Sequence, residues 1–247
     1  METLFEALYN AGLAPDELLD DFYSYDDFIS KIKNGEYDQL LSEFDMTGIL
    51  PEKCPNKMEC ETQLRKDLFS TYSPILKPTE MEFMDVTFVE LNLVLDKVLE
   101  ISQTGEFMSI KVILNQKWTD NRLSWDKDDY KGVEYIHVPI DRLWQPDIIL
   151  YNNIDGNFYP SLSDSWALVD YNGTVVWNPP SVYTSSCNVR VKQFPYDTQK
   201  CTMLFKSMTY EFPEIALIRT NDYVITDKMQ PHIEWELTRA KVTEHDF

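Results

Sequence analysis

The chain has 247 residues, of which 43% are hydrophobic and 13% aromatic, enough to bury the core of one sizeable domain plus a further element. Its formal net charge of −20 excludes nucleic acid as a partner, because phosphates select basic surfaces. Three histidines and seven glycines supply no nucleophile elbow, metal-ligand spacing or phosphate-binding loop. A hydrolase is therefore only a distant alternative, and we expect neither a metal nor a cofactor.

Residues 1–60 are expected to form an acidic helical extension. Apolar residues recur there at helical spacing in four short stretches. Short helices of this kind must pack on one another or on a neighbouring domain to be stable. The acidic pairs Asp20-Asp21 and Asp26-Asp27 lack the ordered ligand pattern of a calcium loop, so we interpret them as solvated helix faces.

The remaining chain is expected to be a β domain. The segment 62–72 predicts one helix, and after Pro78 the pattern changes to strands. Along 108–118, apolar and polar side chains alternate, which is typical of a strand with one buried and one outer face. Ile113 breaks this alternation, because it lies among the polar residues. The fold class is mainly β: a curled β-sandwich of about ten strands in residues 61–247, with an N-terminal helix.

Four cysteines permit three disulfide pairings. Pairing within each near pair is the simplest arrangement: Cys54 with Cys60, and Cys187 with Cys201. A four-cysteine zinc site is the rival, but zinc sites usually combine two tightly spaced pairs, and neither gap has that length. Disulfides imply an oxidising compartment. The sequon that begins at Asn172, on a predicted turn, agrees with secretion and glycosylation.

The segment 187–201 encloses the residues Phe194-Pro195-Tyr196-Asp197 between two cysteines. Its spacing and interior resemble the signature loop of the Cys-loop receptors, the pentameric ligand-gated ion channels. Three further blocks are similar to the nicotinic type in order and spacing: Trp118-Thr119-Asp120, Trp144-Gln145-Pro146-Asp147 and Asn178-Pro179-Pro180. The resemblance covers residues 61–247 and implies an extracellular ligand-binding domain that assembles with identical or homologous subunits in a pentamer. The plainer alternative for the loop is a β-hairpin closed by an ordinary disulfide.

In that family, small-molecule ligands bind between subunits, in a box of aromatic side chains that attracts amines through cation–π interactions. The resemblance implies ligand-binding positions on a principal face (Tyr151, Met208, Tyr210) and on a complementary face (Ile113, Asn115, Leu168, Val176, Asn178). Met208 and Ile113 stand where the family has tryptophans. Met208 also has a plain interpretation as core filler, and Ile113 as a single exposed apolar residue. We expect weak or absent acetylcholine binding and a preference for an apolar or amphipathic ligand.

The resemblance also implies that the lower edge of the domain contacts membrane helices and couples ligand binding to channel opening. The coupling residues would be Phe194, Pro195, Tyr196 and Asp197, together with the turn Ser102-Gln103-Thr104-Gly105. A structural alternative for the first set is stabilisation of the hairpin. No apolar run reaches membrane-spanning length, so the membrane segments would lie beyond this chain. The opening residues do not form a signal peptide, so we expect a mature or trimmed form.

Two alternatives share the predicted fold. A soluble pentameric binding protein would hold a ligand and open no channel, and it would be secreted. An adhesion-type β-sandwich would bind no small molecule at all. The leading interpretation instead places the domain on the extracellular face of the plasma membrane.

Overall fold

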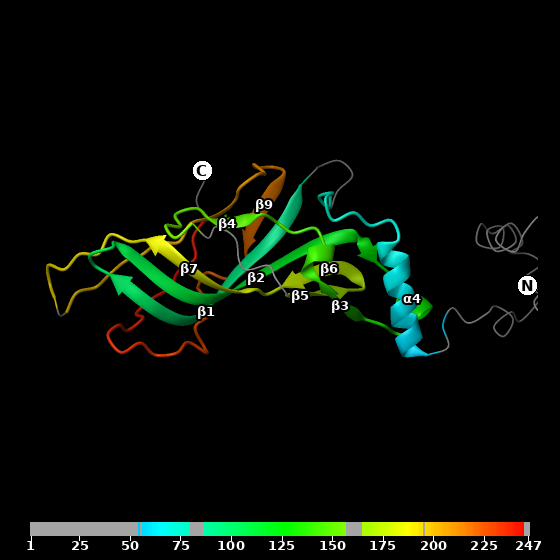
Figure 1. The fold of residues 1–247 in the computed structure, drawn as a ribbon, viewed down its shortest axis with the longest axis horizontal. Helices are drawn as coiled ribbons and strands as arrows, with labels where there is room; N and C mark the ends of the chain where they lie inside the picture. Colours follow the sequence, from blue (N-terminus) through cyan, green and yellow to red (C-terminus); the bar gives the residue numbers. More distant parts are fainter. Residues whose placement is uncertain (1–53, 55, 80–85, 157–164, 195, 245–247) are drawn as a thin grey trace, which may run out of the picture. The chain divides into compact units, whose positions relative to one another are not determined.

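The computed structural model describes residues 54, 56–79, 86–156, 165–194 and 196–244 (Figure 1). The predicted helical extension lies outside the described residues except at its end, and so does Pro195. The described chain contains helix α4 (Lys57–Phe69), the short 3-10 helices η3 (Asp128–Tyr130) and η4 (Ile140–Arg142), and nine strands. The strands are β1 (Thr87–Ser102), β2 (Phe107–Ser124), β3 (Tyr135–Pro139), β4 (Ile148–Leu150), β5 (Trp166–Asp170), β6 (Asn172–Trp177), β7 (Pro180–Ser186), β8 (Phe205–Ser207) and β9 (Ile215–Arg219). The predicted mainly β fold is confirmed.

Helix α4 begins at Lys57 rather than at residue 62, and it ends at Phe69. Asn56 caps it, because its side-chain oxygen accepts a hydrogen bond from the Glu59 backbone N–H (3.0 Å) and its amide donates to the Glu59 carboxylate (2.7 Å). An Asn followed three residues later by Glu is a start signal that the sequence interpretation missed. The proposed boundary after residue 60 therefore falls inside this helix.

The long strand β2 is the centre of the larger sheet, whose order is β3-β5-β6-β2-β1-β9. β1 runs antiparallel along one side of β2, while β7 and β6 follow each other along the other side (Figure 1). β4 and β8 form a second, two-stranded sheet. The two sheets agree with the predicted sandwich.

Side chains along β2 alternate as predicted. Ile110, Val112, Leu114 and Trp118 are buried, whereas Lys111, Ile113 and Lys117 are exposed. The aromatic motif residues also belong to the core: the rings of Trp118 and Trp144 meet edge to face with centroids 6.0 Å apart. Packing therefore accounts for the Trp118 and Trp144 motifs.

Asp120 is fully buried and anchors the segment after α4 to β2. Its carboxylate accepts hydrogen bonds from the Tyr72 hydroxyl (2.9 Å) and from the Arg122 guanidinium (2.8 and 2.7 Å). Arg122 in turn donates to the backbone oxygen of Leu76 (2.9 Å), and its guanidinium lies 4.6 Å from the centroid of the Tyr72 ring. Burial raises the pKa of Tyr72, and the hydrogen bond to Asp120 raises the pKa of Arg122. The cluster is a structural anchor made of mutually satisfied polar groups.

The start of β6, next to the turn from β5, requires glycine at residue 173. Gly173 has a φ of +79°, and a Cβ at this position would lie 2.5 Å from the backbone oxygen of Asp120. The neighbouring Asn172 is exposed at the start of β6. Its side chain is accessible to a glycan, and glycosylation there stays a prediction.

Both predicted disulfides are formed, Cys54–Cys60 and Cys187–Cys201, each with a Cα–Cα distance of 5.0 Å. Because all four sulfurs are bonded in pairs, the zinc alternative is wrong. Among the described residues there is no other group of side chains that could hold a metal ion. Nor does any helix in these segments have the length and apolar character to cross a bilayer.

Alkaline pH is expected to destabilise the domain through Tyr183, whose burial raises its pKa to about 12. An unfolded tyrosine ionises near pH 10, so the stability that depends on neutral Tyr183 is complete below that pH and is lost as the pH rises toward 12. Thermal unfolding followed by circular dichroism should show a smaller loss of Tm over this window in Tyr183→Phe than in the parent. Tyr196→Phe, at an exposed ring, is the control. Equal losses in the parent and Tyr183→Phe would contradict the prediction.

Candidate functional site

The predicted principal residues lie on and beside the small β4–β8 sheet. Ile149 pairs with Lys206, and the Tyr151 backbone N–H donates to the Leu204 oxygen (2.7 Å) just after β4. All three residues of β4, Ile148, Ile149 and Leu150, are buried. Tyr151, the residue after β4, is instead 53% exposed, and Met208 is 62% exposed. Both side chains are therefore accessible beside the β4–β8 sheet.

Asp147 shapes the segment after β8. Its carboxylate accepts from the Ser207 hydroxyl (2.5 Å) and from the Thr209 backbone N–H (2.6 Å), and its backbone oxygen accepts from the Met208 N–H (3.2 Å). The Tyr210 N–H donates to the Ser207 hydroxyl (3.0 Å), and the Tyr210 side chain packs against the core. Tyr210 is therefore less available to a ligand than Tyr151 and Met208.

Lys206 lies beside the predicted principal residues, although the sequence interpretation did not include it among them. Its Nζ lies 4.2 Å from the centroid of the Tyr151 ring, within the range of a cation–π interaction. Only the pairing of β8 with β4 brings Lys206 to the Tyr151 ring, so periodicity along the sequence could not reveal it. The surface around Tyr151 and Met208, called the principal surface below, thus carries an ammonium group that belongs to the chain itself.

The predicted complementary residues share the outer face of the larger sheet. Leu168 pairs with Val176, and Val176 pairs with Lys117, so these side chains form a row across β5, β6 and β2. Ile113 is exposed further along β2, opposite Pro180 of β7. Two polar positions accompany them: half-buried Asn115 and exposed Asn178. An exposed tryptophan, Trp166, lies on the same face of β5 as Leu168 and was also missed.

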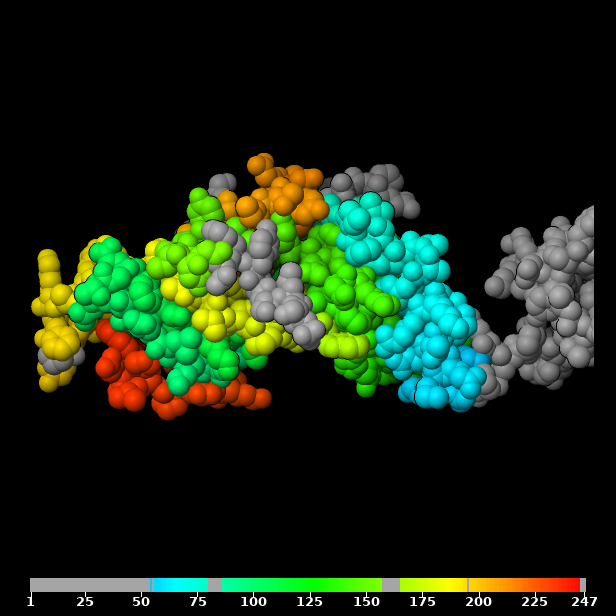
Figure 2. Space-filling model, in the orientation of Figure 1, coloured from blue at the N-terminus to red at the C-terminus, as the bar shows by residue number. Residues whose placement is uncertain are grey.

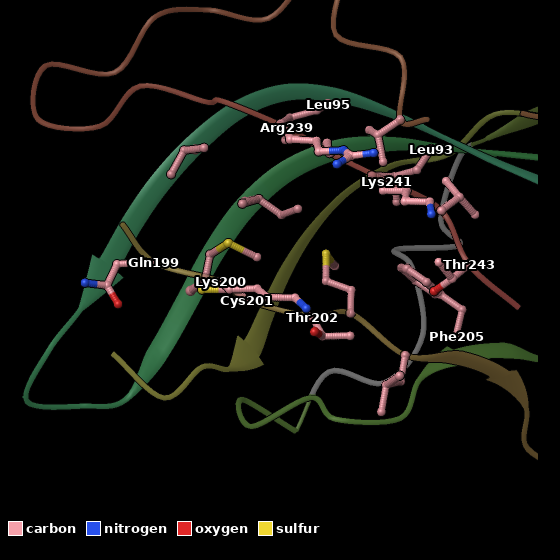
Figure 3. Close-up of a pocket in the computed structure, with 18 of the residues that line it drawn as sticks. Leu93, Leu95, Gln199, Lys200, Cys201, Thr202, Phe205, Arg239, Lys241 and Thr243 are labelled. Carbon is pink, nitrogen blue, oxygen red and sulfur yellow. The ribbon is translucent and has the colours of Figure 1, made fainter. Parts of the chain in front are cut away.

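An open groove of about 2390 Å³ runs between the inner side of β1 and β2 and the segments 196–212 and 234–244. Figure 3 shows Leu93 and Leu95 of β1 near Arg239 and Lys241, with Lys200–Thr202 and Phe205 along the groove. Lys206, Met208 and Tyr210 reach it, whereas Tyr151 and the complementary residues do not.

The signature loop, residues 187–201, projects at one end of the described domain (Figures 1 and 2). Phe194 is 72% exposed and Tyr196 is 89% exposed. The Cys187 N–H donates to the Glu106 oxygen (2.7 Å), so the base of the loop lies beside the β1–β2 turn. Both predicted coupling elements therefore occupy one end, and their role in gating stays a prediction.

The two legs of the loop are tied together by Gln199. Its side-chain oxygen accepts from the Arg190 N–H (2.9 Å), and its amide donates to the Arg190 oxygen (2.9 Å). The same amide donates to the Asp197 carboxylate. Asp197 therefore takes part in holding the loop, as the structural alternative suggested.

Comparison with known proteins adds an independent finding. The family model described as the neurotransmitter-gated ion-channel ligand binding domain matches residues 61–247. The neuronal acetylcholine receptor subunit beta-4 of Gallus gallus is 35% identical over 181 residues, covering 72% of this chain and 38% of the relative. The acetylcholine receptor subunit beta of Rattus norvegicus is 42% identical over 159 residues, which cover 64% of this chain and 31% of the relative.

An insect protein shows a similar degree of likeness. The acetylcholine receptor subunit alpha-like protein of Manduca sexta is 40% identical over 193 residues, covering 74% of this chain and 37% of the relative. The chain thus spans well under half of the length of the curated relatives it matches. The match to their ligand-binding part agrees with the sandwich, the signature loop and its disulfide.

Proposed function

The chain belongs to the neurotransmitter-gated ion-channel ligand-binding domain family, and from this premise we propose that it recognises a small-molecule ligand between the subunits of a pentameric channel. Its relatives are receptor subunits, so it is a receptor domain and not an enzyme. The observation that carries the proposal is the separation of the two predicted residue sets: Tyr151 and Met208 lie beside the β4–β8 sheet, and the complementary residues lie on the larger sheet. A site that uses both sets needs a second copy or a homologous subunit.

The exposed surface supports an apolar or amphipathic ligand over acetylcholine. Met208 and Ile113 are exposed at positions where the family resemblance implies tryptophan. Each lost tryptophan removes cation–π attraction of about 0.5–2 kcal/mol. Leu168 and Val176 add apolar side chains to the complementary face. The ligand would therefore gain more from burial of apolar area than from an ammonium group.

The proposed location is the extracellular face of the plasma membrane. The disulfides Cys54–Cys60 and Cys187–Cys201 require an oxidising compartment. Membrane contact would come from segments outside this chain, next to the exposed Phe194 and Tyr196. These two rings, together with the β1–β2 turn, would pass the binding signal to the pore.

We expect the purified chain to sediment as a pentamer and to bind the amphipathic dye 1-anilinonaphthalene-8-sulfonate at the interface. Ile113→Ser and Met208→Ser should each weaken dye binding several-fold, because each removes apolar area from one side of the site. Ile75→Ser, at an exposed apolar residue after α4, is the matched control and should leave binding unchanged. Calorimetry should give acetylcholine a dissociation constant weaker than about 100 µM.

Two outcomes would contradict this function. Micromolar acetylcholine binding that is lost in Tyr151→Ala would restore the ordinary amine site. A monomer that binds neither molecule would favour the adhesion-type alternative.

A further inference from the structure

The side chain of Lys206 occupies the place that a ligand ammonium would take on the Tyr151 ring. Its Nζ lies 4.2 Å from the ring centroid, a normal distance for a cation–π pair. We propose that Lys206 is a built-in cation that excludes quaternary-ammonium ligands from the principal face and favours an amphipathic ligand with an anionic head. The inference rests on the proposed function, because it concerns the ligand class of the same site.

The backbone pairing of β4 and β8 brings the two side chains together. Lys206 pairs directly with Ile149, and Tyr151 is two positions further along the chain. Such diagonal neighbours on one face of a sheet are within reach of long and aromatic side chains. Hydrogen bonds on both sides of the pair, from Tyr151 N–H to the Leu204 oxygen (2.7 Å) and from Met208 N–H to the Asp147 oxygen (3.2 Å), fix this register. The position of the ammonium is thus a consequence of the fold.

A tethered cation competes well with a free one. The tether gives Lys206 a high effective concentration at the ring, so a ligand ammonium must displace it. The displaced charge stays within a few ångströms, and like charges at that distance repel one another. The acidic net charge of −20 does little to offset this repulsion between the two ammonium groups, because charges more than about 10 Å away are largely screened by salt.

The surroundings of the ammonium suit an amphipathic anion. Met208 lies two residues after Lys206 and is 62% exposed, so it can receive the apolar part of a ligand beside the charge. The nearby carboxylate of Asp147 accepts from Ser207 and Thr209 and so holds the backbone of this segment. A ligand with an anionic head next to an apolar body would thus match both Lys206 and Met208.

The test titrates the assembled full chain with two probes, tetramethylammonium and the anionic dye 1-anilinonaphthalene-8-sulfonate. In Lys206→Gln we expect tetramethylammonium to bind about tenfold more tightly and the dye several-fold more weakly. Weaker dye binding cannot come from a damaged fold, because newly exposed apolar surface would bind more of the dye. Lys206→Arg keeps the charge and should behave as the parent. Lys192→Gln removes an exposed positive charge from the signature loop and should change neither affinity.

The double variant Lys206→Gln/Tyr151→Leu tests the role of the ring, and it should lose the gain for tetramethylammonium. If that gain persists without the ring, or if Lys206→Gln shifts neither probe, the proposal is overturned. If Lys206→Gln shifts neither probe but Ile113→Ser still weakens dye binding, only the inference about Lys206 fails and the proposed function stands. When neither probe binds any variant and the chain is monomeric, the proposed function fails as well.

Discussion

Replacing Cys187 and Cys201 together by alanine is expected to lower the free energy of unfolding by about 3 kcal/mol. The bond joins cysteines 14 positions apart, and it stabilises mainly by restricting the unfolded chain. Its loss also frees the base of the signature loop, which the Cys187 N–H ties to Glu106 beside the β1–β2 turn. Urea unfolding at equilibrium measures the change, and the double replacement avoids a reactive single thiol.

The second disulfide is the matched control. Cys54 and Cys60 are only 6 positions apart, so their double replacement should cost less, about 2 kcal/mol. It should also leave the signature loop unaltered. A larger loss from the Cys54–Cys60 replacement than from the Cys187–Cys201 replacement would refute the loop-length argument for this domain.

Arg122→Ala is expected to destabilise the domain by about 3 kcal/mol or more, because it leaves the carboxylate of Asp120 buried without its charged partner. Asp120 is fully buried, whereas the Arg122 side chain is 32% exposed. The reverse change, Asp120→Asn, should therefore cost less, about 1–2 kcal/mol, since water can reach the guanidinium. Arg122→Ala should therefore lower the stability more than Asp120→Asn does, because Asp120 is more deeply buried than Arg122.

Urea unfolding at neutral pH would rank these variants. Arg219→Ala serves as the control, because Arg219 forms ion pairs with Asp222 and Glu244 at the surface. Such exposed pairs contribute about 0–1 kcal/mol. If Arg122→Ala were no less stable than Arg219→Ala, Asp120 would not depend on Arg122.

Much of the fold could be predicted because its signals are local. The alternation along β2 and the near pairs of cysteines are visible within one segment, and the structure confirms both. The start of α4 was also local, but the Asn56 cap lies between two cysteines and was overlooked. The sequence thus contained more of the fold than its interpretation used.

The chemistry of the principal surface was not predictable in the same way. Tyr151 and Lys206 are far apart in the sequence, and only the register between β4 and β8 brings the ammonium onto the ring. Tyr210 looked like a pocket aromatic, yet the hydrogen bond from its N–H to Ser207 accompanies a side chain that packs on the core. Both features depend on pairing between distant segments, which periodicity does not report.

The two strands that follow each other along one side of β2 leave a break in the pairing on that side. β7 pairs with β2 up to Ile113, which lies opposite Pro180, and β6 pairs with β2 from Gln116 onward, opposite Trp177; Asn178 and Pro179 lie between these ladders. Proline has no N–H, so neither Pro179 nor Pro180 can donate a backbone hydrogen bond to β2. The Leu114 N–H of β2 instead donates to the Pro179 oxygen (3.2 Å). Beside Ile113, β2 is therefore held by β1 on one side, while on the other side its ladder changes from one strand to the next.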